Sequence, residues 1–310
     1  MKTLFRVFAL LPLPILHAVG IALGWLTFLA SGTYRRRFAD NAQQAGYSLP
    51  QVLPAVSEAG KLLGELPRLW FGRAVAIHWE GAALIDTARA QGRGIVFLTP
   101  HLGCFEATAQ AYAARYGRIT VLYRPARKPW LRELVDTARE RANLATAPTT
   151  LAGVKQMLKA LKAGEAVGLL PDQVPPEGLG VWAPFFGRPA YTMTLSARLA
   201  RQTGATVLLA WGERLPWGRG YRIRLRPWPG DIPQEAATAA TRVNAQMERL
   251  IRERPQQYLW GYARYKTPAE GRGMSAKGEG PRERASTGAN AASGRPPGAH
   301  LNGEGSEAVP

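Results

Sequence analysis

The chain opens on a long apolar stretch. Val7 to Ala30 (VFALLPLPILHAVGIALGWLTFLA) carries no formal charge. About 20 apolar helical residues cross the hydrocarbon core of a bilayer, so this stretch is long enough to span one. Pro12 and Pro14 would kink a helix here, which leaves a re-entrant or interfacial segment as an alternative. We predict an N-terminal hydrophobic membrane helix and assign residues 1–33 to a membrane anchor.

A cleaved signal peptide is a further alternative for this stretch. The apolar core of a signal peptide is shorter, about 7 to 15 residues. Arg35, Arg36 and Arg37 follow directly, and basic residues oppose translocation of what comes after them. We therefore expect an uncleaved anchor, with the rest of the chain on the cytoplasmic side.

Beyond the anchor, short apolar runs rich in β-branched residues alternate with longer stretches of helical periodicity. Strands are predicted over 94–99, 119–123, 166–171, 206–211 and 221–228. Helices are predicted over 51–72, 105–116, 129–142, 151–163, 192–203 and 234–254. This alternation predicts an α/β fold with a largely parallel central sheet flanked by helices. We assign residues 34–267 to this domain.

The composition changes at the end of the chain. Residues 268–310 are rich in Gly, Ala, Ser, Pro and charged residues, and they contain no aromatic residue and one leucine, Leu301. Such a segment buries too little apolar surface to offset the entropy of ordering. We predict a disordered tail.

Net charge and cysteine content limit the kinds of partner, metal site and cofactor that the chain can have. The formal net charge of +18 predicts an acidic partner: nucleic acid, an anionic membrane, a phosphorylated substrate or an acidic carrier protein. The single cysteine, Cys104, excludes a disulfide within the chain, and the four histidines form no HExxH motif. Neither GxGxxG after a strand nor GxxxxGK[ST] occurs. We expect no metal and no cofactor.

In sheets of this kind, ligands bind beyond the carboxyl ends of the strands. The residues at such positions are Thr99, Pro100 and His101 after the first strand, Arg124 after the second, and Asp172 and Gln173 after the third. His101 and Glu106 lie in TPHLGCFE, at the start of a predicted helix. The turn can place the Glu106 carboxylate against the imidazole, a pair suited to general-base catalysis. Alternatively, His101 caps the helix and Glu106 complements its dipole.

Four motifs occur in order along the chain: HLGCFE from His101, YRP from Tyr123, LLPDQ from Leu169 and PFFGRPAYT from Pro184. With the closing QQYLWGYARYKT, this order resembles the lipid A biosynthesis acyltransferases, the lauroyl and myristoyl transferases within the lysophospholipid acyltransferase superfamily. The resemblance runs from the N-terminal anchor to about Thr267, and it makes the domain an acyltransferase catalytic domain.

The resemblance implies an enzyme on the cytoplasmic face of the bacterial inner membrane. It implies an acyl carrier protein thioester as donor and, as acceptor, a hydroxyl on the acyl chains of a Kdo-bearing lipid A precursor, in direct transfer without a cofactor. His101 would be the general base and Glu106 its partner. Another lipid acceptor, a lysophospholipid or an aminoacyl lipid, is the alternative.

The resemblance also implies a substrate-binding role for Arg124, Asp172 and Gln173, which match the second and third motifs. Arg124 could instead pair with a surface carboxylate, and Asp172 could be an ordinary turn residue. The fourth motif adds Phe186, Gly187 and Arg188, in an apolar turn that could floor an acyl-chain groove or be an ordinary core turn.

Two other hypotheses remain from the residues themselves. Cys104 close to His101 suggests a cysteine acyl-enzyme, but the short turn and the lack of a third orienting residue favour a small buried residue. The arginines and tryptophans of residues 211–228 suggest a nucleic-acid-binding protein, but no helix-turn-helix, RNP or zinc signature is present. We expect no nucleic-acid partner.

Overall fold

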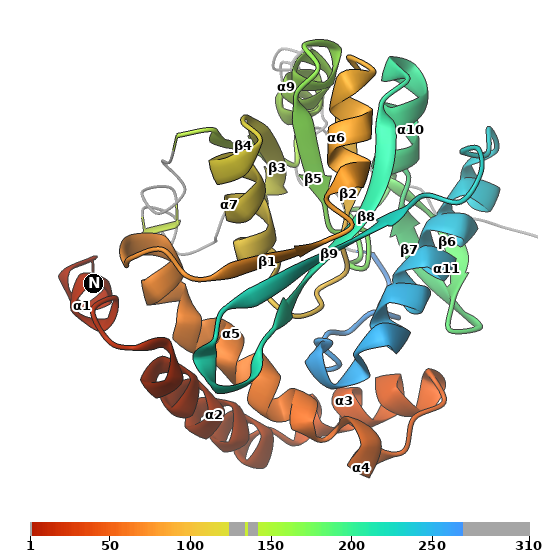
Figure 1. Cartoon of the computed structure of the whole chain (residues 1–310). Helices are drawn as coiled ribbons and strands as arrows, with labels where there is room; N and C mark the ends of the chain where they lie inside the picture. The colour runs from red at the N-terminus through yellow and green to blue at the C-terminus, as the bar shows by residue number, and fades with distance from the viewer. Residues whose placement is uncertain (1, 124–133, 136–141, 269–310) are drawn as a thin grey trace, which may run out of the picture. The chain divides into compact units, whose positions relative to one another are not determined.

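The computed structural model describes residues 2–123, 134–135 and 142–268 (Figure 1). They belong to one compact unit, Met1–Gly271. The predicted disordered tail, except for Pro268, lies outside the described residues. So does the predicted helix over 129–142, except for residues 134, 135 and 142.

A seven-stranded sheet forms the centre of this unit, in the order β1-β9-β8-β2-β5-β3-β4. Its strands are β1 (Ile77–Glu80), β2 (Ile95–Leu98), β3 (Ile119–Tyr123), β4 (Leu144–Pro148), β5 (Ala166–Leu169), β8 (Thr206–Arg214) and β9 (Tyr221–Pro227). Every neighbouring pair is parallel except β8 and β9, which are antiparallel. The largely parallel sheet predicted from the sequence is therefore confirmed.

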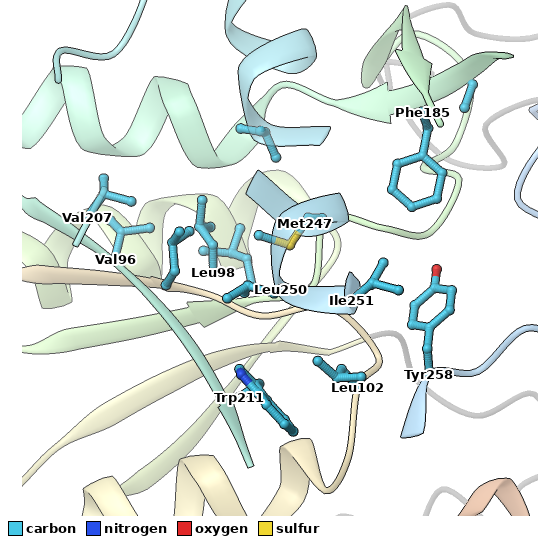
Figure 2. Close-up of a cluster of buried hydrophobic side chains, with 14 of the residues drawn as sticks. Val96, Leu98, Leu102, Phe185, Val207, Trp211, Met247, Leu250, Ile251 and Tyr258 are labelled. Atoms are coloured by element: carbon cyan, nitrogen blue, oxygen red, sulfur yellow. The ribbon is translucent and has the colours of Figure 1, made fainter. Parts of the chain in front are cut away.

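Helices cover both faces of the sheet (Figure 1). They are α6 (Ala83–Ala90), α7 (Phe105–Arg115), α9 (Leu151–Lys162), α10 (Leu195–Thr203) and α11 (Ala236–Glu253). Side chains of β2 lie alternately on the two faces of the sheet, because successive residues of a strand point to opposite sides. Val96 and Leu98 pack with residues of α9, α10 and α11, among them Met247 and Leu250 (Figure 2). Phe97 packs on the other side, with residues of α6 and α7.

The burial of β2 and β5 explains why these strands could be predicted. Their sequences, IVFL and AVGL, are buried at every residue. A central parallel strand covered by helices on both faces has this continuous apolar pattern. β9, next to the edge strand β1, alternates buried and half-exposed residues through most of its length.

A two-stranded hairpin departs from the prediction. β6 (Gly180–Phe185) and β7 (Arg188–Met193) are antiparallel strands joined at Phe186 and Gly187, which both have positive φ. Two positive φ values are typical of the tight turns that join hairpin strands. The predicted helix over 192–203 is wrong in its first residues, because the second strand runs to Met193 and α10 begins at Leu195.

The N-terminal region forms five helices instead of one anchor helix and one further helix. They are α1 (Lys2–Phe8), α2 (Leu13–Ala30), α3 (Gly32–Gln44), α4 (Leu49–Val52) and α5 (Pro54–Phe71). Proline causes two of the breaks, because it lacks the amide hydrogen that a helix interior needs and is favoured at a helix start. Pro12 caps α2, and Pro54 opens α5. Among the described helices, α2 alone is long and apolar enough to cross a membrane.

Candidate functional site

The loop after β2 carries His101 to the carboxyl end of the sheet. β2 lies between β8 and β5, and the loop passes directly from the strand into α7. The His101 side chain is 16% exposed, so its ring is partly accessible. This is the position at which an α/β sheet binds its ligands.

A buried carboxylate holds one edge of the His101 ring. Asp172, which follows the neighbouring strand β5, accepts from the His101 backbone N–H at 2.8 Å and contacts Nδ1 at 2.8 Å. Burial alone would raise the pKa of Asp172, but the charge and hydrogen bonds of His101 outweigh it and lower that pKa. Asp172 is therefore an ionised acceptor, and it favours the tautomer with hydrogen on Nδ1.

The other ring nitrogen faces an amide. Gln173 Nε2 lies 2.9 Å from His101 Nε2. With hydrogen on Nδ1, Nε2 carries the lone pair and accepts from the Gln173 amide. The two contacts hold the ring with Nδ1 toward Asp172 and Nε2 toward the Gln173 amide. A substrate hydroxyl at Nε2 would take the place of the Gln173 amide.

Glu106 lies in the first turn of α7, as the sequence predicted. It is buried, and Oε2 accepts from Trp70 Nε1 at 3.5 Å. The carboxylate placed at Nδ1 of the imidazole is Asp172, although the motif spacing had suggested Glu106. The ring of Phe105, beside Glu106, packs against the imidazole with 5.1 Å between centroids.

The chain after α11 returns to support the loop that carries His101. Leu259 N–H donates to His101 O at 3.2 Å, and Gly103 N–H donates to Gln257 O at 3.0 Å. Gly103 has a φ of +60°, and a Cβ there would lie 2.0 Å from Gly212 O. The loop therefore needs glycine at this position, and its path is held from two sides.

Sequence reasoning gave no site role to two buried residues behind Asp172. Burial, and then the charge of Asp172, raise the pKa of Tyr258 well above its ordinary value, so its hydroxyl remains protonated. Arg264 donates to Tyr191 O and to Thr192 Oγ1, each at 2.7 Å. Its positive charge helps to keep the Asp172 pKa low. The available signal was their place in the closing motif QQYLWGYARYKT.

Cys104 is fully buried beside this loop. Burial, and then the charge of Glu65, raise its pKa well above the ordinary value. A thiol that stays protonated is a poor nucleophile. The structure therefore supports the small buried residue and argues against an acyl-enzyme at Cys104.

A narrow apolar cavity lies between α7 and the sheet, next to the loop. Its lining includes Phe97, Thr99, Phe105, Tyr112, Leu170 and Leu225. Phe105 belongs both to this lining and to the contact with the His101 ring. The ring of Phe105 therefore lies between the cavity and the imidazole, and the cavity has an apolar lining.

The remaining predicted residues lie elsewhere or outside the described part. Phe186 is buried in the core, where its N–H donates to Glu248 Oε1 at 2.7 Å and its ring packs near Trp260. Gly187 completes the hairpin turn, and Arg188 stacks over the Tyr265 ring at 4.6 Å. Arg124 lies outside the described residues.

The fold and the site together define a class of enzyme. A histidine whose Nδ1 contacts a buried carboxylate, at the carboxyl end of a parallel sheet and near an apolar cavity, is an arrangement that can remove a proton from a hydroxyl next to an apolar chain.

Comparison with known proteins makes the class specific. The family model for the bacterial lipid A biosynthesis acyltransferases matches residues 3–267, and the chain belongs to this family. It is 30% identical to the lipid A biosynthesis lauroyltransferase of Escherichia coli K12, over 84% of this chain and 88% of that protein. It is 26% identical to the palmitoleoyltransferase of that strain, over 83% and 87% of the chains, and 24% identical to its myristoyltransferase, over 59% and 57%. The protein is an acyltransferase, as the sequence motifs predicted.

Proposed function

We propose that this enzyme adds a secondary fatty acyl chain to a Kdo-bearing lipid A precursor, using an acyl carrier protein thioester, at the cytoplasmic face of the bacterial inner membrane. The observation that carries the proposal is the His101–Asp172 pair beside an apolar cavity. Family membership supports a lipid A-type acceptor. The net charge of +18 favours acidic partners, which include acyl carrier proteins, phosphorylated lipids and the inner leaflet.

In the proposed reaction, the acceptor hydroxyl displaces the Gln173 amide and donates its hydrogen bond to His101 Nε2. The oxygen attacks the thioester carbonyl carbon as its proton passes to Nε2, and Asp172 stabilises the imidazolium that forms. The tetrahedral intermediate then collapses, the carbon–sulfur bond breaks, and the imidazolium returns the proton to the departing thiolate. The products are an ester, a free thiol and a neutral His101.

Glu106 assists this reaction from the first turn of α7, and Asp172 orients the ring in the proposed arrangement. Arg124, Gln173, Phe186, Gly187 and Arg188 remain proposed contributors to substrate binding. The contacts of the described residues support Gln173 most directly, because its amide marks the place that the acceptor hydroxyl would take.

The acyl chain is proposed to enter the cavity beside Phe105. The names of the three relatives from Escherichia coli refer to lauroyl, palmitoleoyl and myristoyl chains. The chain transferred therefore differs within the family, and the side chains that close the cavity are suited to set its length.

An acceptor comparison tests the proposal. Purified enzyme in detergent receives labelled acyl carrier proteins of several chain lengths, with a Kdo-bearing tetraacyl lipid A precursor, a lysophospholipid or an aminoacyl lipid as acceptor. We expect wild-type enzyme to acylate the lipid A precursor and His101→Ala to form no product. Transfer by folded His101→Ala at the wild-type rate would refute the base. Transfer only to another acceptor would refute the assigned substrate.

A further inference from the structure

α2 packs against α5 with its backbone in direct contact. Gly20 and Gly24 on α2 face Gly60 and Gly64 on α5, and Figure 1 shows the two helices side by side. A Cβ at Gly60 would lie 2.0 Å from Gly20 O, and a Cβ at Gly20 would lie 2.6 Å from Gly60 O. Glycines four residues apart lie on one face of a helix and allow two helices to approach this closely. The inner face of α2 is therefore shaped to fit α5.

Polar contacts join the same two helices. His17 Nε2 on α2 lies 3.1 Å from Glu65 Oε2 on α5, and Trp25 Nε1 donates to Ser57 Oγ at 3.0 Å. Glu65 is fully buried and also accepts from Arg214 at 2.7 Å and 2.8 Å. If α2 separated from α5 to cross a bilayer alone, His17 would enter lipid. The buried ion pair of Glu65 and Arg214 would also lose the packing of α2 against it. Both changes are unfavourable.

The outer face of α1 and α2 is apolar and exposed. Its exposed residues are Leu4, Val7 and Leu10 at the start, then Ile15, Val19, Leu23, Leu26 and Leu29 along α2, with exposed fractions between 42% and 77%. We call these eight residues the apolar face. Ile15, Val19, Leu23 and Leu26 follow one another at intervals of three or four residues, so they share one face of α2, and an exposed apolar surface marks a site of interaction.

The charges around the apolar face indicate which partner covers it. The chain has no acidic residue before Asp40, whereas Arg6 and Arg35 to Arg37 are exposed at the two ends of this region. Trp217, 86% exposed, belongs to the turn Pro216–Gly218 (η1), which packs against Pro14 at the start of α2. Apolar residues bordered by arginine and tryptophan suit the interface of an anionic bilayer.

We infer that α2 is not a free membrane-spanning anchor: it stays docked on α5, and the apolar face lies in the plane of an anionic lipid leaflet on the same side as the catalytic domain. The contacts with α5 carry the inference and the length of α2 does not, because its 18 residues extend about 27 Å at 1.5 Å each, close to the roughly 30 Å hydrocarbon core. The inference rests on the proposed function only in taking the enzyme to work at a membrane.

The first test uses cysteine labelling to determine on which side of the membrane α1 and the catalytic domain lie. Thr3→Cys lies on exposed α1 and Lys155→Cys on exposed α9, and the wild type is the control because Cys104 is fully buried. Each protein is produced in bacterial membranes, from which sealed right-side-out and inverted vesicles are prepared and treated with a membrane-impermeant maleimide. The inference predicts that Lys155→Cys is labelled in inverted vesicles and that neither cysteine is labelled in right-side-out vesicles, because Thr3 lies four residues before Val7 and shares the face of α1 that meets the leaflet. Labelling of Thr3→Cys from the side opposite to Lys155→Cys would overturn it.

The second test reads lipid binding by flotation with vesicles of phosphatidylglycerol and phosphatidylethanolamine. The double variant Leu23→Asp with Leu26→Asp changes exposed positions only, and Leu151→Asp on α9 is the matched control, since Leu151 is also exposed. The double variant is expected to lose at least about tenfold in partitioning, because it removes apolar area and adds repulsion from anionic lipid. The control keeps wild-type binding.

Wild-type-like flotation of the double variant would overturn the inference. So would a stable dimer that covers the apolar face and does not bind vesicles. Acyl transfer to a detergent-dispersed acceptor is measured in parallel and separates the two proposals. If the enzyme is active but the labelling or flotation result contradicts docking, the inference alone is refuted. Docking without activity on any lipid A precursor refutes the proposed function alone.

Discussion

At the scale of single residues, Glu65 shows how a buried charge depends on its partners. Glu65 is fully buried and contacts Arg214, His17 and the Tyr221 hydroxyl. Burial alone would raise its pKa, but the charge and hydrogen bonds of Arg214, with a smaller contribution from His17, lower that pKa from 4.5 to about 2. A folded-state pKa below the unfolded value adds stability above pH 4.5, and this stability is lost as the pH falls toward 2.

We predict that Glu65→Gln lowers the free energy of unfolding by about 3–5 kcal/mol at pH 7, because it leaves Arg214 buried with a weaker set of partners. The difference from wild type should narrow as the pH falls below 4.5 and become small near pH 2, where half of the Glu65 side chains are protonated. Urea unfolding, monitored by tryptophan fluorescence at each pH, measures the free energy of unfolding of the variant and of the wild type. Glu177→Gln, at an exposed position, is the control. A difference that does not change with pH would contradict the ionised Glu65.

His101 shows what residue spacing could and could not predict. The strand-end rule pointed to His101, Asp172 and Gln173, and the structure brings the three together because β2 and β5 pair in parallel and end together. The spacing of HLGCFE favoured Glu106 as the carboxylate on the ring. The spacing of residues in a motif predicts only contacts between residues close in sequence. Asp172 contacts the imidazole because β5 pairs with β2, and the two residues are far apart in sequence. Tyr258 and Arg264 were missed because their contacts depend on the return of the chain after α11.

At the scale of elements, the contact between α2 and α5 depends on glycine. We predict that Gly60→Ala forces the helices apart and lowers the free energy of unfolding by roughly 1–3 kcal/mol, as overpacking does, because its Cβ would lie 2.0 Å from Gly20 O. Gly32→Ala is the matched control, since its Cβ would meet nothing closer than 3.9 Å. Thermal unfolding compares the two. Equal melting temperatures would show that the helices do not pack this closely.

The cavity between α7 and the sheet gives a second prediction at this scale. Ala109 on α7 lines the cavity, whereas Ala114 on the same helix is exposed. Ala109→Leu should shorten the preferred acyl chain by about two carbons and disfavour the original chain at least tenfold, because misfit by a methylene in an apolar pocket costs about tenfold or more. Competition between acyl carrier proteins of different chain length measures the preference. An unchanged preference, like that expected for Ala114→Leu, would exclude the cavity as the acyl site.

The prediction of elements succeeded where burial produced a continuous pattern. β2 and β5 were found because every residue in them is buried. β1, with the sequence IHWE, was missed because its short mixed pattern becomes a strand only through pairing with β9. The hairpin of β6 and β7 was missed for a similar reason: its turn was recognised as compact, but the flanking strands lack a clear alternation.

At the scale of the whole molecule, the α/β class followed from the alternation of strands and helices, but the order of strands did not. Pairing between β1 and β9 joins segments far apart in the sequence, and no local pattern specifies it. The composition of the N-terminal stretch likewise suggested an anchor, but not its contact with α5. That contact depends on glycines in both helices, which become meaningful only when the two helices are seen together.

The central claim is that His101, oriented by Asp172, is the base of an acyl transfer to a lipid A precursor. The most direct measurement is the single-turnover rate of transfer from acyl carrier protein to a Kdo-bearing tetraacyl precursor, for wild type, Asp172→Asn and Glu106→Gln, across pH. We predict that Asp172→Asn loses roughly 10²- to 10⁴-fold in rate, because the ring loses its tautomer and its stabilised imidazolium, as when the orienting carboxylate of a catalytic triad is replaced. Glu106→Gln should lose less. A wild-type rate in folded Asp172→Asn, or a larger loss in Glu106→Gln, would contradict the account.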